Sequence, residues 1–305
     1  MSTDRRGTLV VIVGPTGSGK TAVAVQLAQR LHAPILSTDS RQVFRGLAIG
    51  TAQPSAEELA AATHYFIADR DVSDDYNAGR FEVEALALLE RLFADHDHVI
   101  AVGGSGLYVD ALCNGFDPLP QADPALRQAL EERLRREGLP ALVEELKQLD
   151  PVYWAAVDRN NPARVLRALE VCRLTGQSYS DQRKGVQRER PFRIVKLGID
   201  TPREELYDRI NRRVDAMMQA GLLAEAERMF PLRHLNALQT VGYQELFAFL
   251  EGHGTLEEAV ELIKRNSRRY AKRQLTWFRR DASIRWFGRE EVEAMKIYCE
   301  KFAET

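Results

Sequence analysis

Short hydrophobic runs and longer amphipathic segments alternate along most of this chain. Two of the longer segments, Ala22–Leu31 and Gly79–Phe93, place apolar residues three or four positions apart, which predicts helices that bury one face. Five short apolar runs have the length of buried strands: Thr8–Val13, Pro34–Thr38, Val99–Val102, Arg193–Ile199 and Ile284–Phe287. Strands that alternate with helices indicate a parallel sheet with helices on both faces.

The pattern changes between Asp123 and Thr175, where helix signals occur and strand signals do not. Asp123–Pro124 is a helix cap followed by proline at the first helical position, and Asn161–Pro162 repeats that signal. The segment from Gly176 to Arg190 is polar and basic, and we expect an exposed loop there.

These patterns predict two domains. Residues 1–115 and 193–305 are expected to form an α/β core, and residues 116–192 an all-helical insertion domain. In the second half of the core, Thr201–Pro202 is expected to cap a long helix, and Thr255–Phe278 to form another.

Composition narrows the class without fixing the function. The chain has 305 residues, 45% of them hydrophobic, and a net charge of −2, so nothing global attracts it to nucleic acid. Cys113, Cys172 and Cys299 are far apart, which argues against a zinc site and suits a reducing compartment. The apolar run before Gly14 has only five residues, too few for a secretory signal, and no run approaches the roughly 20 that a membrane helix needs. We therefore expect a cytoplasmic protein with no membrane partner.

Positive charge is concentrated near the C-terminus. The segment Lys264–Arg289 contains ten Lys and Arg residues and one acid, Asp281. Aromatic residues are interleaved with the basic ones: Tyr270, Trp277, Phe278, Trp286 and Phe287. Two interpretations remain open, a solvated helix face with core aromatics behind it, or a surface that contacts phosphates and stacks on bases.

The sequence IVGPTGSGKT contains the phosphate-binding pattern G-x-x-x-x-G-K-[ST]. The residues expected to bind phosphate are Gly14, Pro15, Thr16, Gly17, Ser18, Gly19, Lys20 and Thr21. Backbone amides of the loop and the following helix N-terminus attract an anion, Lys20 adds a positive charge, and the Thr21 hydroxyl is expected to bind Mg²⁺. A strand, this loop and a helix in succession predict a P-loop NTPase-like core.

An ATPase usually adds an acid at the end of another core strand. The strand Val99–Val102 ends instead in the glycine-rich turn Gly103–Gly106. The nearest acid after a strand is Asp39, which follows Pro34–Thr38. At the carboxyl end of a parallel strand Asp39 would face the phosphate loop, where it can accept a proton from a hydroxyl or from an amine.

Besides the phosphate loop, six further blocks resemble the bacterial tRNA dimethylallyltransferases, also called tRNA isopentenyltransferases, in the same order. The blocks are DSRQVFRGLAIGTAQP (39–54), VGGSGLYV (102–109), NNPARVLRALEVCRLTG (160–176), LYDRINRRVDAMMQAGLLAEAE (206–227), QTVGYQEL (239–246) and AKRQLTWFRR (271–280). The resemblance covers nearly the whole chain and is far more specific than the phosphate loop alone.

The resemblance implies a reaction. Enzymes of this family transfer a dimethylallyl group from dimethylallyl diphosphate to the exocyclic N6 of the adenine next to the anticodon, on its 3′ side. The phosphate loop would then hold a diphosphate leaving group, whose developing charge Lys20, the loop amides and Mg²⁺ on Thr21 would stabilise. Asp39 would accept a proton from the attacking N6. Such an enzyme needs no acid that orients water.

The resemblance also implies tRNA contacts. Near the target base the expected contacts are Asp39, Ser40, Arg41, Gln42 and Ser105. On the insertion domain, the residues expected to hold the anticodon stem-loop are Arg127, Ala163, Arg164, Val165, Leu166 and Arg167. A third group of expected RNA contacts is Gln239, Thr240, Val241, Gly242, Tyr243 and Gln244. Arg41 stands where an uncharged residue is common in the family, and it either adds a phosphate contact or alters target preference. Arg209 and Arg213 lie four residues apart, and they either close over the diphosphate or face solvent.

Three alternatives remain. An adenylate isopentenyltransferase, which makes free cytokinin nucleotides, would need neither the insertion nor the basic segment. A P-loop small-molecule kinase would use the same loop for phosphoryl transfer. An RNA-binding protein with a vestigial loop would not require Lys20, Thr21 and Asp39 together. The family resemblance suggests a monomer.

Overall fold

The structure is a computed structural model that describes residues 7–117, 119–185 and 187–303. The chain divides into two compact units, which are Met1–Cys113 with Arg190–Thr305, here called the core unit, and Asn114–Glu189, the helical unit. The helical unit begins two residues before the predicted limit of 116 and ends three residues before 192.

A six-stranded sheet in the order β3-β2-β4-β1-β5-β6 runs through the core unit. Every pairing within it is parallel, which confirms the predicted α/β class with a parallel sheet. The strands are β1 (Thr8–Val13), β2 (Ile35–Ser37), β3 (His64–Tyr65), β4 (His98–Gly103), β5 (Arg193–Asp200) and β6 (Arg285–Gly288). The two-residue strand β3 was not predicted, because two residues carry no periodicity.

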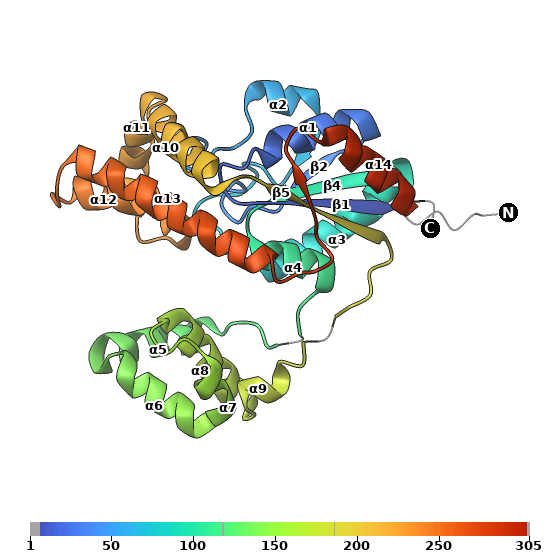
Figure 1. Ribbon diagram of the computed structural model, residues 1–305. Coiled ribbons are helices and arrows are strands. Elements are labelled where there is room, and N and C mark those ends of the chain that lie inside the picture. The colour runs from blue at the N-terminus through green and yellow to red at the C-terminus, as the bar shows by residue number, and fades with distance from the viewer. Residues whose placement is uncertain (1–6, 118, 186, 304–305) are drawn as a thin grey trace. The chain divides into compact units, whose positions relative to one another are not determined.

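Helices cover both faces of this sheet. Figure 1 shows α1 and α14 on one face and α3 and α4 on the other. The apolar residues Val10 and Ile12 of β1 pack in one buried cluster with α1 and α14. The helices of the core unit are α1 (Lys20–Leu31), α2 (Ala56–Ala61), α3 (Ala78–Asp95), α4 (Gly106–Asn114), α10 (Arg203–Gln219), α11 (Leu222–Met229), α12 (Tyr243–Leu250), α13 (Leu256–Phe278) and α14 (Val292–Ala303), with 3-10 turns at Phe230–Leu232 and Asn236–Leu238.

The parallel arrangement brings the starts of three loops to one edge of the sheet. The last residue of β1, Val13, is in register with Gly103 of β4 and Gly198 of β5. Ser37 of β2 is in register with Val102. The phosphate loop, the segment after β2 and the glycine-rich turn after β4 therefore leave the sheet at the same edge, where open α/β sheets bind ligands.

The helical unit contains α5 (Pro124–Glu137), α6 (Leu139–Leu149), α7 (Pro151–Ala156), α8 (Pro162–Thr175) and α9 (Tyr179–Gln182). Both predicted caps are confirmed, because Asp123 accepts from the amide of Leu126 at 2.9 Å and Asn161 from that of Arg164 at 3.3 Å. The short helix α9 lies inside the predicted loop 176–190. Its Ser180 hydroxyl donates to the buried Asp150 at 2.7 Å, a tertiary contact that the local sequence does not reveal.

The two predicted helix starts in the second half differ in outcome. Thr255 caps α13 in a reciprocal capping box with Glu258, as expected. Thr201 does not cap α10; the cap residue is Pro202, and the Thr201 hydroxyl is buried without a hydrogen-bond partner among the described residues. Within the described ranges, every helix is too short or too polar to cross a bilayer.

Candidate active site

The phosphate loop joins β1 to α1, and its backbone requires glycine at two points. Gly17 and Gly19 have φ of 83° and 88°, a left-handed conformation that side chains with a Cβ rarely adopt. Helix α1 begins at Lys20 directly after the loop, so its N-terminal amides face the same space. The geometry is that of a cradle for phosphate groups.

Three cationic side chains converge on this cradle. Burial, helped by Arg213, lowers the pKa of Lys20 to about 8, although Asp39 opposes the shift. Burial also lowers the pKa of Arg213, which makes no ion pair within the described part of the chain. The Arg209 guanidinium lies so close to the loop that a Cβ at Gly19 would be 2.9 Å from its Nη2 atom. Cations that burial holds near one another in this way favour a multiply charged anion between them.

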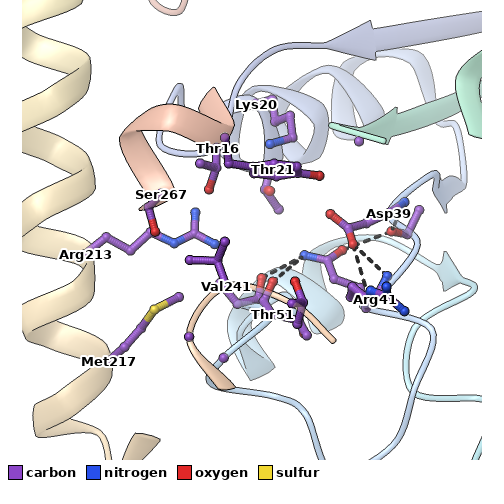
Figure 2. Close-up of a pocket in the computed structure, with 18 of the residues that line it drawn as sticks. Thr16, Lys20, Thr21, Asp39, Arg41, Thr51, Arg213, Met217, Val241 and Ser267 are labelled. Carbon is purple, nitrogen blue, oxygen red and sulfur yellow. Dashed lines mark hydrogen bonds between the residues drawn. The ribbon is translucent and has the colours of Figure 1, made fainter. Parts of the chain in front are cut away.

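Asp39 follows β2 by two residues and faces the same pocket as Lys20 (Figure 2). Its Oδ1 atom accepts from the amides of Arg41 at 2.9 Å and Gln42 at 3.3 Å, so a local turn fixes the carboxylate. The other oxygen, Oδ2, has no hydrogen-bond partner within the described ranges. Asp39 therefore keeps one oxygen available to accept a proton.

The residues after Asp39 connect it to two other segments. Ser40 donates its amide to Ser105 Oγ at 3.0 Å, which ties the segment to the start of α4. The Gln42 side chain is used within the protein, because it accepts from Ser37 Oγ at 2.9 Å and donates to the carbonyl of Ala52 at 2.8 Å. Gln42 thus shapes the pocket by holding the loop that contains Ala52.

Arg41 is the departure from the family pattern noted above. Its guanidinium reaches Asn236 Oδ1 at 3.5 Å and makes no ion pair with a described residue. Burial lowers its pKa, with Tyr108, Asp39 and Tyr270 opposing the shift. Arg41 lines the pocket with most of its donors unused.

Helix α13 packs against the glycine-rich turn after β4. Gln274 accepts from the amide of Thr16 at 2.8 Å and donates to the carbonyl of Gly104 at 2.8 Å. A Cβ at Gly104 would collide with the Gln274 amide, and one at Gly106 would collide with the Trp277 indole. The close approach of helix α13 thus explains two glycines of the turn. The sequence had shown only that this turn contains no acid.

Glu225 on α11 is a second buried polar residue that connects separate segments. Its carboxylate, 2% exposed, accepts from the amides of Ile49 at 2.9 Å and Gly50 at 2.8 Å and from the Tyr243 hydroxyl at 2.6 Å. Gly50 and the residues after it line the pocket. Three neutral donors therefore satisfy the buried Glu225 carboxylate, and these hydrogen bonds fix the position of the pocket-lining loop that begins at Gly50.

Gln274 and Glu225 were not predicted as site residues from the sequence. One signal for Gln274 was available, because it interrupts the buried stripe of α13 formed by Ile263, Ala271 and Phe278. A polar residue on an apolar face calls for a partner. Glu225 offers the same kind of signal on α11, where it shares the buried face with Leu222 and Ala226.

The pocket collects several predicted residues from separate elements, as Figure 2 shows. Those that line it are Thr16, Lys20, Thr21, Asp39, Arg41, Gln42, Thr240, Val241 and Gly242, together with Arg213. Of the two open interpretations of Arg213, the structure favours the one in which it faces the phosphate site. Met217 of α10 and Ser267 of α13 also line it and were not predicted, whereas Tyr270 of α13, another lining residue, is one of the aromatic residues noted in the basic segment.

Several of the predicted RNA contacts have buried side chains. Tyr243 is 0% exposed, and its hydroxyl is used by Glu225, so its side chain is not available to RNA. Val165 and Leu166 lie in the hydrophobic core of the helical unit, where α8 turns its apolar face inward. Gln239 and Gln244 are exposed and hydrogen-bond to each other at 2.8 Å.

The cations of the helical unit also differ from one another. Ala163 and Arg164 are exposed near the start of α8. Arg167 donates at 2.7 Å to Glu170, which is buried, and to the carbonyl of Pro120. Arg127 pairs with Glu131 at 3.0 Å on α5. Arg164 is thus better placed for a ligand phosphate than Arg167 or Arg127.

The basic segment 264–289 fits in part the interpretation as a solvated helix face and in part the interpretation as an RNA-contact surface. Lys264, Arg279 and Arg289 pair with acids of the core unit, and Phe278 and Phe287 are buried. Of the remaining cations of α13, Arg268 is half-buried and donates to Asn211. The other four are exposed and make no ion pair with a described residue: Arg265, Arg269, Lys272 and Arg273. Arg273 stacks over the Tyr270 ring at 5.6 Å, and Trp277 is 36% exposed.

Fold and site together define a P-loop α/β protein with an anion cradle, a carboxylate opposite it and an inserted helical unit. The IPP transferase family model matches residues 42–281, and the chain belongs to this family.

Among its relatives, tRNA dimethylallyltransferase 2 of Parabacteroides distasonis is 50% identical over 287 residues, covering 94% of this chain and 96% of the relative. The tRNA dimethylallyltransferase of Cytophaga hutchinsonii is 51% identical over 292 residues, covering 96% of each.

Solved structures agree with this assignment. The full-length tRNA isopentenylpyrophosphate transferase from Bacillus halodurans matches with a TM-score of 0.73 and 39% identity, covering 98% of this chain and 97% of that one. A eukaryotic dimethylallyltransferase described as acting on tRNA matches with a TM-score of 0.74 and 26% identity, covering 93% of this chain and 74% of that one.

Proposed function

We propose that this protein transfers a dimethylallyl group from dimethylallyl diphosphate to N6 of the tRNA adenine that follows the anticodon on its 3′ side, and releases diphosphate. The observation that carries the proposal is one pocket with a phosphate cradle, Lys20 and Arg213 on one side and Asp39 on the other. The names of the relatives support the same reaction. The proposal includes a monomeric enzyme, which rests on the family resemblance, and a cytoplasmic location, for which the separated cysteines are the support.

On the donor side, the loop amides, Lys20 and the two arginines Arg209 and Arg213 would bind the diphosphate. Their charge matters most as the carbon–oxygen bond breaks, because the leaving diphosphate then gains negative charge. These groups are positioned before the reaction begins and need not reorganise during it. Lys20 would be held in its protonated form by the diphosphate, which offsets the effect of burial on its pKa.

We assign magnesium to Thr21 in this pocket. Thr21 lines the pocket and offers a hard oxygen donor, the type that Mg²⁺ prefers. When bound, the ion would supply additional positive charge to the diphosphate oxygens. Thr21 is the residue that we assign to the metal, as the phosphate-loop pattern suggests.

On the acceptor side, the adenine must leave its stack to reach a buried pocket. Its N6 nitrogen then attacks the dimethylallyl carbon, the bond from that carbon to the diphosphate oxygen breaks, and one N6 proton passes to the Asp39 carboxylate. Asp39 can take this proton because its Oδ2 atom has no hydrogen-bond partner within the described ranges. Ser105 and Arg41, beside the same segment, would contact the nucleotide.

The decisive experiment mixes the protein with dimethylallyl diphosphate, Mg²⁺ and unmodified tRNA. We expect transfer of the five-carbon group to tRNA and not to free AMP, which is the acceptor of an adenylate isopentenyltransferase. Lys20→Ala should weaken use of dimethylallyl diphosphate and slow transfer. Hydrolysis of ATP at an ordinary enzymatic rate, on the order of 1 s⁻¹, would contradict the leaving-group role and favour phosphoryl chemistry. Binding of tRNA without transfer would favour an RNA-binding protein.

A further inference from the structure

We propose that Gln274 is a positioning residue that sets the phosphate-binding loop against the turn that carries Ser105, and thereby sets the separation of the two substrates. The inference rests on the proposed function, since it assigns the loop to the diphosphate and the turn to the nucleotide. Gln274 lies on α13, distant in sequence from both segments.

Both functional groups of the Gln274 amide are used. Its Oε1 atom accepts from the Thr16 amide at 2.8 Å, and its Nε2 atom donates to the Gly104 carbonyl at 2.8 Å. The side chain is 5% exposed, so water does not compete readily for these two backbone groups. One planar amide therefore spans the loop after β1 and the turn after β4.

The surrounding glycines show how close this approach is. Nothing larger than hydrogen fits at Gly104 without displacing the Gln274 amide, and one helical turn later Trp277 covers Gly106 in the same manner. The Trp277 indole also donates to Asp110 Oδ2 at 3.2 Å. Helix α13 is thus docked on the turn at two points, of which only Gln274 also reaches the phosphate loop.

The turn is also hydrogen-bonded to the segment that contains Asp39. Ser105 lies next in sequence to Gly104 and accepts from the Ser40 amide at 3.0 Å, and Ser40 follows Asp39. Gln274 consequently sits between the donor side and the acceptor side of the pocket. Because transfer requires near-contact between the reacting atoms, a displacement of about 1 Å between the two sides can cost roughly 100-fold in rate.

The test replaces Gln274 with methionine, which has similar length and neither hydrogen-bonding group. Single-turnover transfer should be roughly 10-fold to 100-fold slower in Q274M, while separately measured affinities for dimethylallyl diphosphate and for tRNA remain essentially unchanged. Hydrogen exchange of the Thr16 amide should accelerate in the same variant, without any substrate present. Gln274→Glu, which keeps the acceptor for Thr16 and loses the donor to Gly104, should also slow transfer, and it carries the test if Q274M does not fold.

Ala271→Gly is the matched control. Ala271 is buried on the same helix, and glycine there weakens the helix without removing a bond to either loop. At equal loss of melting temperature, the control should retain a faster transfer rate than Q274M. A folded Q274M with a wild-type rate and an unchanged Thr16 amide would overturn the proposal, as would a control that is equally slow. If the wild-type protein transfers nothing to tRNA, the proposed function fails, while the exchange measurement still reports on Gln274.

Discussion

The two sides of the pocket are built in opposite ways. The phosphate side comes mainly from one continuous stretch, Gly14–Thr21, whose glycines and helix start fix its shape locally. The acceptor side is assembled from segments that are far apart, with Gln42, Glu225 and Gln274 making the connections between them. A local motif determines the first side, whereas the second exists only after the chain has folded.

The strongest test of this contrast removes the proton acceptor from the acceptor side and keeps the local structure. Asp39→Asn keeps an oxygen that can accept from the amides of Arg41 and Gln42, so the turn should survive. It loses the proton acceptor, and we expect transfer to slow by roughly 10²-fold to 10⁴-fold. Affinity for tRNA, measured by filter binding, should change little. Near-normal turnover in this variant would leave Asp39 as a positioning residue only.

The same contrast explains how much the sequence alone could predict. Hydrophobic periodicity predicted five strands, the parallel sheet and the long helices, because each such element reflects local burial. The phosphate loop and the position of Asp39 at a strand end followed from local patterns. The contacts of Gln274 with Thr16 and of Glu225 with Gly50 span 258 and 175 residues, so no local pattern encodes them. Tyr243 illustrates this limit, since the segment expected to contact RNA includes a side chain that is buried in the core.

A second prediction concerns the phosphate side and its pH dependence. The pKa of Lys20 is lowered to about 8, so its ammonium is charged below that pH and loses its proton above it. Affinity for dimethylallyl diphosphate should therefore fall as pH rises, by up to about tenfold between pH 7 and pH 9. Lys20→Arg is the control, because a guanidinium remains charged over this range and should flatten the profile. Isothermal titration at each pH gives the measurement, and a flat wild-type profile would refute this assignment of the charge.

A third prediction compares two buried carboxylates. Glu225→Gln replaces an acceptor of three hydrogen bonds with an amide that cannot accept from all three donors, so the loop at Ile49–Gly50 should shift. We expect kcat/KM for tRNA to fall about fivefold, as for the loss of one hydrogen bond of about 1 kcal/mol. Glu82→Gln is the control, since Glu82 is also buried but pairs with Arg190 at 2.8 Å and does not line the pocket.

Both variants should unfold at lower temperature, and only Glu225→Gln should change kcat/KM. Equal losses of activity in the two variants at matched stability would mean that Glu225 acts through stability alone. The loop at Ile49–Gly50 would then be a passive part of the acceptor side.

The smallest expected effect comes from the surface cations, where the question is whether the acceptor side extends along α13. Arg273 is exposed and has no ion pair within the described ranges, so its charge is available for RNA. Each phosphate contact adds a slope of roughly −0.7 in the logarithmic dependence of affinity on salt. Arg273→Glu should weaken tRNA binding and flatten that slope by about one contact. Arg164→Glu should do the same from the helical unit.

The design of this last test follows from the contacts of each cation. Arg167 is a poor choice, because its removal would leave the buried Glu170 without its partner and destabilise the helical unit. Arg91→Glu on α3 is the matched control, since Arg91 is exposed and equally without an ion pair to the described residues. Affinity for dimethylallyl diphosphate should stay constant in all three variants, because none of the three arginines lines the pocket that contains the cradle. If Arg273→Glu and Arg91→Glu give the same affinity and the same slope as the wild type, the exposed cations of α13 are solvated surface, and the acceptor side ends at the pocket.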